Sequence, residues 1–307
     1  MRYRLLIVIA TVIWGSSFVI VKDMTGYISP AWILFIRFSI ATAILSLSFV
    51  KYRELYFKRT NALYGIGIGA ALFLGYYFQT LGITDTTPGK NAFLTATYCV
   101  IVPFSTWLLM RRRPRRFNVI AAMLGIAGIG LISLDEGFGI GFGDAMTLVS
   151  AVFYALHITL VSKFAKERSI YVLTIWQFFA VALCSFIVAL ALEAPPDFSS
   201  FPTEAWPSIL YLSVIVTALA LLFQNIGQAH LPPASAALLL SFESVFGVLF
   251  SIALGAEALT LRVAGGFVLV FAAIVVSEAF PELFRKRQER HERQERIEAE
   301  AQTRSEG

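Results

Sequence analysis

Three titratable side chains stand inside long apolar stretches of this 307-residue chain: Arg37, His157 and Glu243. Ionisable groups are costly in a bilayer, and those found there usually face a protein interior or a water-filled path for ions or solutes. A low dielectric favours the neutral carboxyl, so Glu243 could take up and release a proton, and His157 at a similar depth could complete a proton relay. Arg37 could anchor a carboxylate. Arg37 could instead bond helix-end carbonyls or extend outward to the membrane surface. His157 and Glu243 could serve helix packing and could lie on opposite helix faces.

Aromatic and amide side chains in the same stretches could line a path for a solute. Rings can stack on cationic groups, and amides can hydrogen-bond polar ones. Helix packing is the alternative for all of them, and interfacial anchoring for those near helix ends. Together with Arg37, His157 and Glu243, the candidate substrate-binding residues are Trp14, Tyr76, Gln79, Tyr98, Trp176, Gln224 and Asn225.

The elements that carry these residues are predicted to be transmembrane helices. Hydrophobic residues make up 57% of the chain and charged residues 15%, with a mean hydropathy of +0.72, whereas soluble domains carry about 25% charged residues. Because no backbone polar group can stay unpaired in lipid, an apolar run of about 20 residues forms a spanning helix. The predicted spans are 4–22, 30–50, 61–83, 91–110, 117–134, 144–163, 170–192, 207–228, 235–255 and 262–280.

Charges between the spans predict the orientation. Lys and Arg gather before the first span, after every second span and in the C-terminal tail, while acidic residues such as Asp135 and Glu193 dominate the other loops. The positive-inside rule then places both termini in the cytoplasm. The net charge of +5 therefore reports orientation in a membrane, and no nucleic-acid partner is expected.

The two halves of the chain resemble each other. Gln79-Thr80-Leu81-Gly82 has a counterpart in Gln224-Asn225-Ile226-Gly227, and a proline-containing connector follows each. Five spans is an odd number, so the second half must cross the membrane in the opposite sense, as in carriers built from inverted repeats. The predicted fold is an all-α integral membrane protein with ten transmembrane helices in two inverted five-helix repeats. The repeats are residues 1–136 and 142–281, and a charged cytoplasmic tail follows at 282–307.

Other types of site are not indicated. Cys99 and Cys184 fall within apolar spans, and no Cys/His cluster has metal-ligand spacing, so neither a disulfide nor a metal is expected. No Walker sequence and no catalytic constellation is present, so no cofactor and no catalytic residue is expected. Gly65-Ile66-Gly67-Ile68-Gly69 lacks the strand–turn–helix context of a dinucleotide loop. Glycines four apart in an apolar helix instead indicate close helix packing.

Four segments are specific enough to suggest a family: Trp14-Gly15-Ser16-Ser17-Phe18 with Lys22, Arg37-Phe38, Tyr76–Gly82 and Thr86–Thr95. With these segments the chain resembles the EamA family of the drug/metabolite transporter superfamily over about residues 4–280. It departs from the family pattern at Leu254-Gly255-Ala256-Glu257, which carries an inserted alanine, and at the basic run 111–116. The resemblance implies ten helices in two inverted repeats and transport of small organic solutes.

The predicted function is secondary active transport of a small organic solute across the cytoplasmic membrane of a bacterium. Alternating access and export follow from the resemblance, and Glu243 could couple transport to protons. Arg37 favours a carboxylate and Glu243 a cation, so an amino acid or a related metabolite would satisfy both. The alternative is a membrane protein that handles lipid-linked substrates, as a flippase or an intramembrane enzyme. Membrane lipids are the other expected partners, and the chain could be a monomer or a homodimer.

Overall fold

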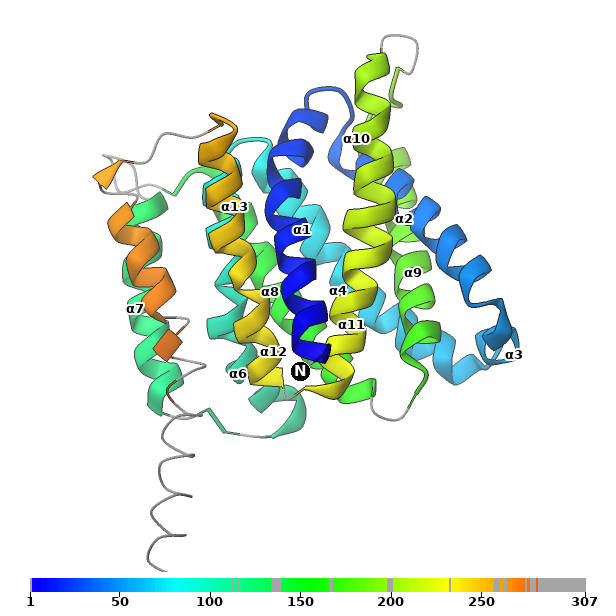
Figure 1. The fold of residues 1–307 in the computed structure, drawn as a ribbon, viewed down its shortest axis with the longest axis horizontal. Coiled ribbons are helices and arrows are strands. Elements are labelled where there is room, and N and C mark those ends of the chain that lie inside the picture. Colours follow the sequence, from blue (N-terminus) through cyan, green and yellow to red (C-terminus); the bar gives the residue numbers. More distant parts are fainter. Residues whose placement is uncertain are drawn as a thin grey trace, which may run out of the picture.

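The chain folds into a bundle of helices, drawn from a computed structural model in Figure 1. The structure describes residues 2–111, 113–114, 116–133, 140–165, 168–197, 201–231, 233–256, 260–261, 264–273, 275–276 and 280. All the regular elements of these ranges are helical. Within these ranges, eight helical stretches are long and apolar enough to cross a membrane.

Four of the crossing stretches lie in each half of the sequence. The first four are α1 (Arg2–Met24), α2 (Pro30–Ser48), α4 (Arg59–Ile83) and the pair α5 (Pro88–Ala96) and α6 (Tyr98–Met110). The others are α8 (Phe142–Phe164), α9 (Ile170–Leu192), the series α10 (Trp206–Leu210), η3 (Tyr211–Leu219) and α11 (Ala220–His230), and the pair α12 (Pro233–Leu240) and α13 (Phe242–Ala253). Short helices η1 (Val50–Tyr52), α3 (Arg53–Tyr56) and η2 (Thr203–Ala205) lie in the connections.

These stretches coincide with eight of the ten predicted spans. The predicted span 117–134 corresponds to α7 (Arg116–Ser133), of which Arg116–Gly128 is a shorter apolar helix. The predicted span 262–280 contains the short apolar helix Ala264–Ala273 and falls partly outside the described residues. The count of ten transmembrane helices and the inverted repeat therefore stay predictions.

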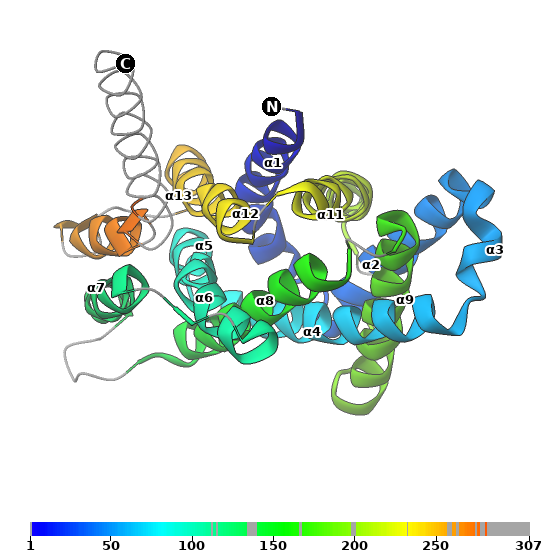
Figure 2. The same cartoon turned by 90° about the horizontal axis from the view of Figure 1, so that it is seen from below.

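The helices pack in two facing rows. Seen from below, α13, α12, α1 and α11 form one row, and α6, α8, α4 and α9 form the other (Figure 2). Within the rows α4 packs along α8 and α9, and α1 packs along α11 and α13. Glycines permit the closest approaches: a Cβ on Gly69 of α4 would lie 2.7 Å from the Ala180 Cβ of α9. Such small-residue contacts replace the hydrophobic driving force that helices lack in lipid.

Charged groups mark the two ends of the bundle. The N-terminus lies at one end, together with α3 and its flanking basic residues Lys51, Lys58 and Arg59, and we call this end the N-terminal face (Figure 1). At the opposite end, acidic side chains cap helices. The Asp85 carboxylate accepts a bond of 3.0 Å from the Gly143 N–H beside the start of α8, and the Glu193 carboxylate accepts one of 3.0 Å from the Ala31 N–H of α2. Carboxylates are favourable there because helix N-termini carry partial positive charge.

Two crossing stretches are broken near their middle. Thr97 separates α5 from α6, and Ser241 separates α12 from α13. After each break the backbone makes a tighter i→i+3 bond, from Val100 N–H to Thr97 O at 3.0 Å and from Ser244 N–H to Ser241 O at 3.1 Å. Such short tight turns within a helix often mark hinges.

Candidate functional site

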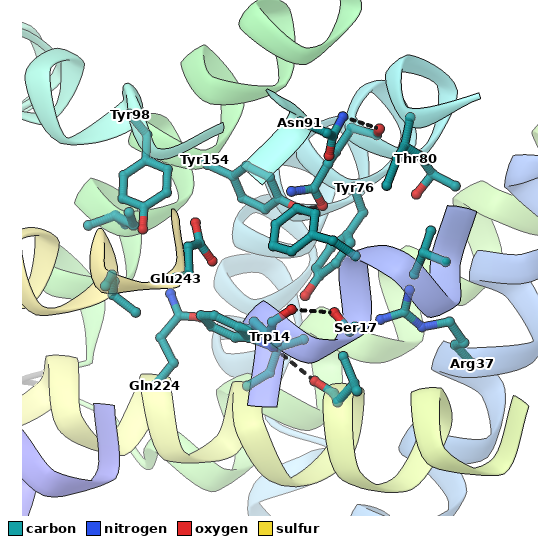
Figure 3. Close-up of a pocket in the computed structure, with 18 residues that line it drawn as sticks. Trp14, Ser17, Arg37, Tyr76, Thr80, Asn91, Tyr98, Tyr154, Gln224 and Glu243 are labelled. Carbon is teal, nitrogen blue, oxygen red and sulfur yellow. Dashed lines mark hydrogen bonds between the residues drawn. The ribbon is translucent and has the colours of Figure 1, made fainter. Parts of the chain in front are cut away.

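A small cavity lies in the middle of the bundle, between helices from both halves of the sequence (Figure 3). Its volume is about 50 Å³, which leaves room for only a few water molecules. Its wall includes seven of the ten candidate residues: Trp14, Arg37, Tyr76, Gln79, Tyr98, Gln224 and Glu243. The most distant of them, Trp14 and Glu243, are 229 positions apart in the sequence, so only the tertiary fold brings the whole set together.

Arg37 reaches the cavity from the side of α2 and is 3% exposed. Its Nε donates a hydrogen bond of 3.1 Å to the Thr217 hydroxyl, and its guanidinium carbon lies 5.5 Å from the centre of the Tyr76 ring. These two contacts hold the charge in one place and supply a cation–π attraction. Figure 3 shows the guanidinium turned toward Ser17 and Tyr76. An arginine fixed in this way can present a planar pair of N–H donors to a carboxylate.

The partner of Arg37 lies on a π-helix, η3. Thr217 donates its own hydroxyl hydrogen to the Leu212 carbonyl at 2.7 Å, so its oxygen is free to accept from Arg37. In the same segment the Val216 carbonyl accepts a bond of 3.1 Å from Nε1 of Trp14. π-helices are rare and frequently occur at functional sites, because the wider turn changes which backbone and side-chain groups face inward. Here the wider turn holds two cavity residues from the first half of the chain.

Glu243 faces the cavity from the first turn of α13 and is 6% exposed. Figure 3 shows the Tyr98 hydroxyl on the same side of the cavity as its carboxyl group. Figure 3 places the Gln224 amide close to Glu243, with the ring of Trp14 between this acid and Arg37. Within the described part of the chain, Arg37 and Glu243 form no ion pair with each other. The cavity therefore has a basic side and an acidic side.

Aromatic rings and amides connect the two sides. Tyr154 packs edge-on against Tyr76, with ring centres 5.4 Å apart, and donates a hydrogen bond of 2.8 Å to Oε1 of Gln79. Nε2 of Gln79 then donates to the Thr95 hydroxyl at 3.0 Å. Tyr154 and Asn91 also line the cavity, although neither is one of the ten candidate residues. The signal that could have found Tyr154 is an aromatic ring inside an apolar stretch, a feature that it shares with the cavity residues Tyr76 and Tyr98.

Three candidate residues lie outside the cavity: His157, Trp176 and Asn225. Trp176 donates through Nε1 to the Tyr56 carbonyl at 3.1 Å, near the N-terminal face. Nε2 of His157 lies 3.0 Å from Oε1 of Gln177, so its partner is an amide of α9. The proton relay between His157 and Glu243 stays a prediction, since no hydrogen bond joins them in the described residues.

The same described ranges contain no group of three His, Cys, Asp or Glu side chains arranged as a metal site. One ion pair lies beyond the cavity, toward the end of the bundle opposite the N-terminal face. Nζ of Lys90 lies 2.8 Å from the Asp144 carboxylate, which also accepts a bond of 2.6 Å from the Thr86 hydroxyl. This cluster joins the starts of α5 and α8.

Comparison with known proteins gives the same class of protein as the sequence resemblance, a transporter. A model of the EamA-like transporter family matches residues 1–134 and 141–278. The chain is 33% identical to an uncharacterized transporter of Archaeoglobus fulgidus, across 88% of this chain and 83% of that protein. It is 28% identical to the uncharacterized transporter YvbV of Bacillus subtilis, across 89% of this chain and 90% of that protein. A crystal structure with 19% sequence identity superposes with a TM-score of 0.67 over 91% of this chain and 97% of the other, which shows a shared fold. The chain belongs to the EamA-like transporter family and is a multi-pass membrane transporter.

Proposed function

We propose that the protein is a secondary active transporter of a small zwitterionic solute, an amino acid or a related metabolite. One observation carries this proposal: a buried arginine and a buried acid stand on opposite sides of one cavity without pairing with each other. A solute carboxylate would bind the guanidinium of Arg37, and a solute ammonium group would bind the carboxylate of Glu243. Buried charges need such partners, because an unpaired charge in low dielectric is costly. The rings of Trp14 and Tyr76 would enclose the carbon skeleton.

Transport would proceed by alternating access. A cavity of about 50 Å³ is too small for most metabolites, so the described state is close to an occluded one. The breaks at Thr97 and Ser241 lie within two residues of the cavity residues Tyr98 and Glu243, so a small change there would widen the cavity and open it to one side. Two inverted five-helix repeats, residues 1–136 and 142–281, would supply the two alternative openings.

The direction of transport and its coupling to protons complete the proposal. The basic residues at the N-terminal face favour a cytoplasmic location for both termini in a bacterial inner membrane. Export would release the solute at the end that carries the Lys90–Asp144 pair. A proton on Glu243 would neutralise the acidic side of the cavity and weaken ammonium binding. Proton uptake at Glu243 would in this way drive solute release.

The experiment combines ligand binding with transport. Detergent-purified protein would be screened by thermal shift against amino acids, nucleosides, sugars and organic cations at pH 5.5 and pH 7.5. A ligand that binds the folded state raises its apparent melting temperature by mass action. Each hit would then be tested for uptake into proteoliposomes, with and without a pH gradient. We expect a zwitterion to bind and to be transported.

Variants locate the binding site. Arg37→Gln and Glu243→Gln each remove one buried charge, and we expect each to weaken binding at least about tenfold, as for other buried charge contacts. Trp176→Phe is the matched control, because Trp176 lies outside the cavity. This variant should bind the solute with the same affinity as the parent protein. If no zwitterion binds to a monodisperse sample, or if binding survives both charge removals, the proposal is wrong. Lipid-linked substrates would then be tested next.

A further inference from the structure

A second group of buried polar side chains lies outside the central cavity, and we call it the inner cluster. It consists of His157 on α8, Thr174 and Gln177 on α9, and Asn225 and Gln228 on α11. All five side chains are at most 1% exposed. His157 bonds to Gln177 at 3.0 Å, and Nδ2 of Asn225 donates to the Thr174 hydroxyl at 3.0 Å and to Oε1 of Gln177 at 3.5 Å. The cluster therefore joins three helices that are distant in sequence.

The inner cluster contains more hydrogen-bonding groups than its own members can satisfy. Nδ1 of His157, Nε2 of Gln177, Oδ1 of Asn225 and both amide atoms of Gln228 have no partner in the described part of the protein. The great majority of buried polar atoms in proteins have a partner, either in the protein or in ordered water. Gln228 lies one helical turn after Gln224 and three residues after Asn225, so it shares a face of α11 with both. Five such atoms together point to a partner that is not part of the chain.

The position of the cluster relates it to the cavity. His157 lies next to the cavity residue Ile158 on α8, and Gln228 lies four residues after the cavity residue Gln224 on α11. Both helices run toward the N-terminal face along this stretch (Figure 1). The cluster therefore begins level with the cavity, at His157, and extends about one turn of helix, or roughly 5–6 Å, beyond it toward that face, at Gln228.

The chemistry of the unpaired atoms limits what can bind. Because Nε2 of His157 faces the amide oxygen of Gln177, Nε2 acts as the donor and Nδ1 of the neutral ring is an acceptor. Oδ1 of Asn225 is a second acceptor, the Nε2 group of Gln177 is a donor, and Gln228 offers both functions. This mixture of neutral donors and acceptors fits water, a hydroxyl group or a carboxamide. It contrasts with the two opposite charges of the central cavity.

We infer that the inner cluster is a hydrated binding site on the path between the central cavity and the N-terminal face. Water occupies it in the absence of solute, and the uncharged hydrogen-bonding groups of the solute replace that water during passage. The second part of this inference rests on the proposed transport function, whereas the first part does not. A cluster that serves only to hold α8, α9 and α11 together would be dry and closed to reagents.

Cysteine accessibility tests the hydrated site without a known solute. In a background with Cys99→Ala and Cys184→Ala, Gln228→Cys would be exposed to the charged, membrane-impermeant reagent sodium (2-sulfonatoethyl) methanethiosulfonate in oriented vesicles. Ser185→Cys on α9 is the matched control, because Ser185 is also fully buried and its hydroxyl also lacks a protein partner. We expect Gln228→Cys to react at least tenfold faster than Ser185→Cys, and only from the side of the N-terminal face. Equal rates at the two positions would overturn the inference.

Gln228→Met tests the role of the cluster in transport. Methionine keeps the length of the side chain and removes no protein hydrogen bond, so the melting temperature should stay within a degree or two of the parent value or rise. We expect solute uptake into proteoliposomes to fall at least fivefold. Unchanged uptake would overturn the solute part of the inference. Reactive Gln228→Cys in a protein that transports no solute would support the hydrated site and count against the proposed function alone.

Discussion

Two glycines on α4 form a natural pair for testing how closely this helix must approach α9. A Cβ added at Gly69 would lie 2.7 Å from the Ala180 Cβ and 2.7 Å from the Gln177 carbonyl oxygen. A Cβ added at Gly67 would meet no atom within 4 Å. We therefore expect Gly69→Ala to destabilise the protein and Gly67→Ala to leave it unchanged or more stable.

The size of the effect follows from these contacts. Carbon atoms pack best at about 3.5–4.0 Å, so Gly69→Ala must move α9 away by roughly 0.8 Å or distort its backbone. Overpacking of this kind costs about 1–3 kcal/mol. Both substitutions gain the same helix propensity, about 1 kcal/mol relative to glycine. The difference between the two variants therefore isolates the contact, and Gly69→Ala should be about 1–3 kcal/mol less stable than Gly67→Ala.

The assay is the loss of monodisperse protein with temperature, measured by size-exclusion chromatography in one detergent at one protein concentration. Unfolding of such proteins is often irreversible, so both variants must be heated at the same rate. Gly69→Ala should also impair transport, because Gln177 belongs to the inner cluster and its backbone would be displaced. Equal melting temperatures for Gly69→Ala and Gly67→Ala would refute the reasoning about the α4–α9 contact.

Three further substitutions each probe one polar side chain and its contacts. Thr217→Val removes the acceptor for Arg37, and we expect solute affinity in a binding assay to fall about tenfold, equivalent to roughly 1.4 kcal/mol, with Thr217→Ser restoring it. Trp14→Phe removes the donor to the Val216 carbonyl and should lower the stability by about 0.5–1.5 kcal/mol, seen as a lower melting temperature in detergent. Glu193→Gln removes the charge that caps the first turn of α2, so it should cost about 1 kcal/mol, and less at high salt. An unchanged affinity in the first variant, or unchanged melting in the other two, would contradict the role given to that bond.

Much of the helical architecture could be predicted because lipid leaves the backbone few choices. A segment in hydrocarbon must satisfy its own N–H and C=O groups, so apolar runs become helices whatever their neighbours are. Eight of the predicted spans accordingly coincide with crossing helices. The glycine spacing on α4 likewise predicted a packing face, and Gly65 and Gly69 both lie against α9, whereas Gly67 faces away from it.

The candidate site shows where sequence reasoning stops. Gln224 and Asn225 are adjacent in the chain and were treated alike, yet Gln224 lines the central cavity and Asn225 belongs to the inner cluster. Neighbouring residues on a helix point about 100° apart, so the rotation of α11 decides which of them meets the cavity. That rotation depends on contacts with helices far away in the chain.

The sequence by itself determined the class of protein and the approximate limits of its crossing helices, because both depend on local composition and on the cost of an unpaired backbone in lipid. Only the tertiary structure decided which polar groups share a cavity. Arg37 donates a hydrogen bond to Thr217 on a π-helix, and Trp14 donates one to the carbonyl of the preceding residue, Val216. These contacts join residues about 200 positions apart, and a helical period cannot encode them. The separation of a charged cavity from a neutral inner cluster is likewise a property of packing between helices.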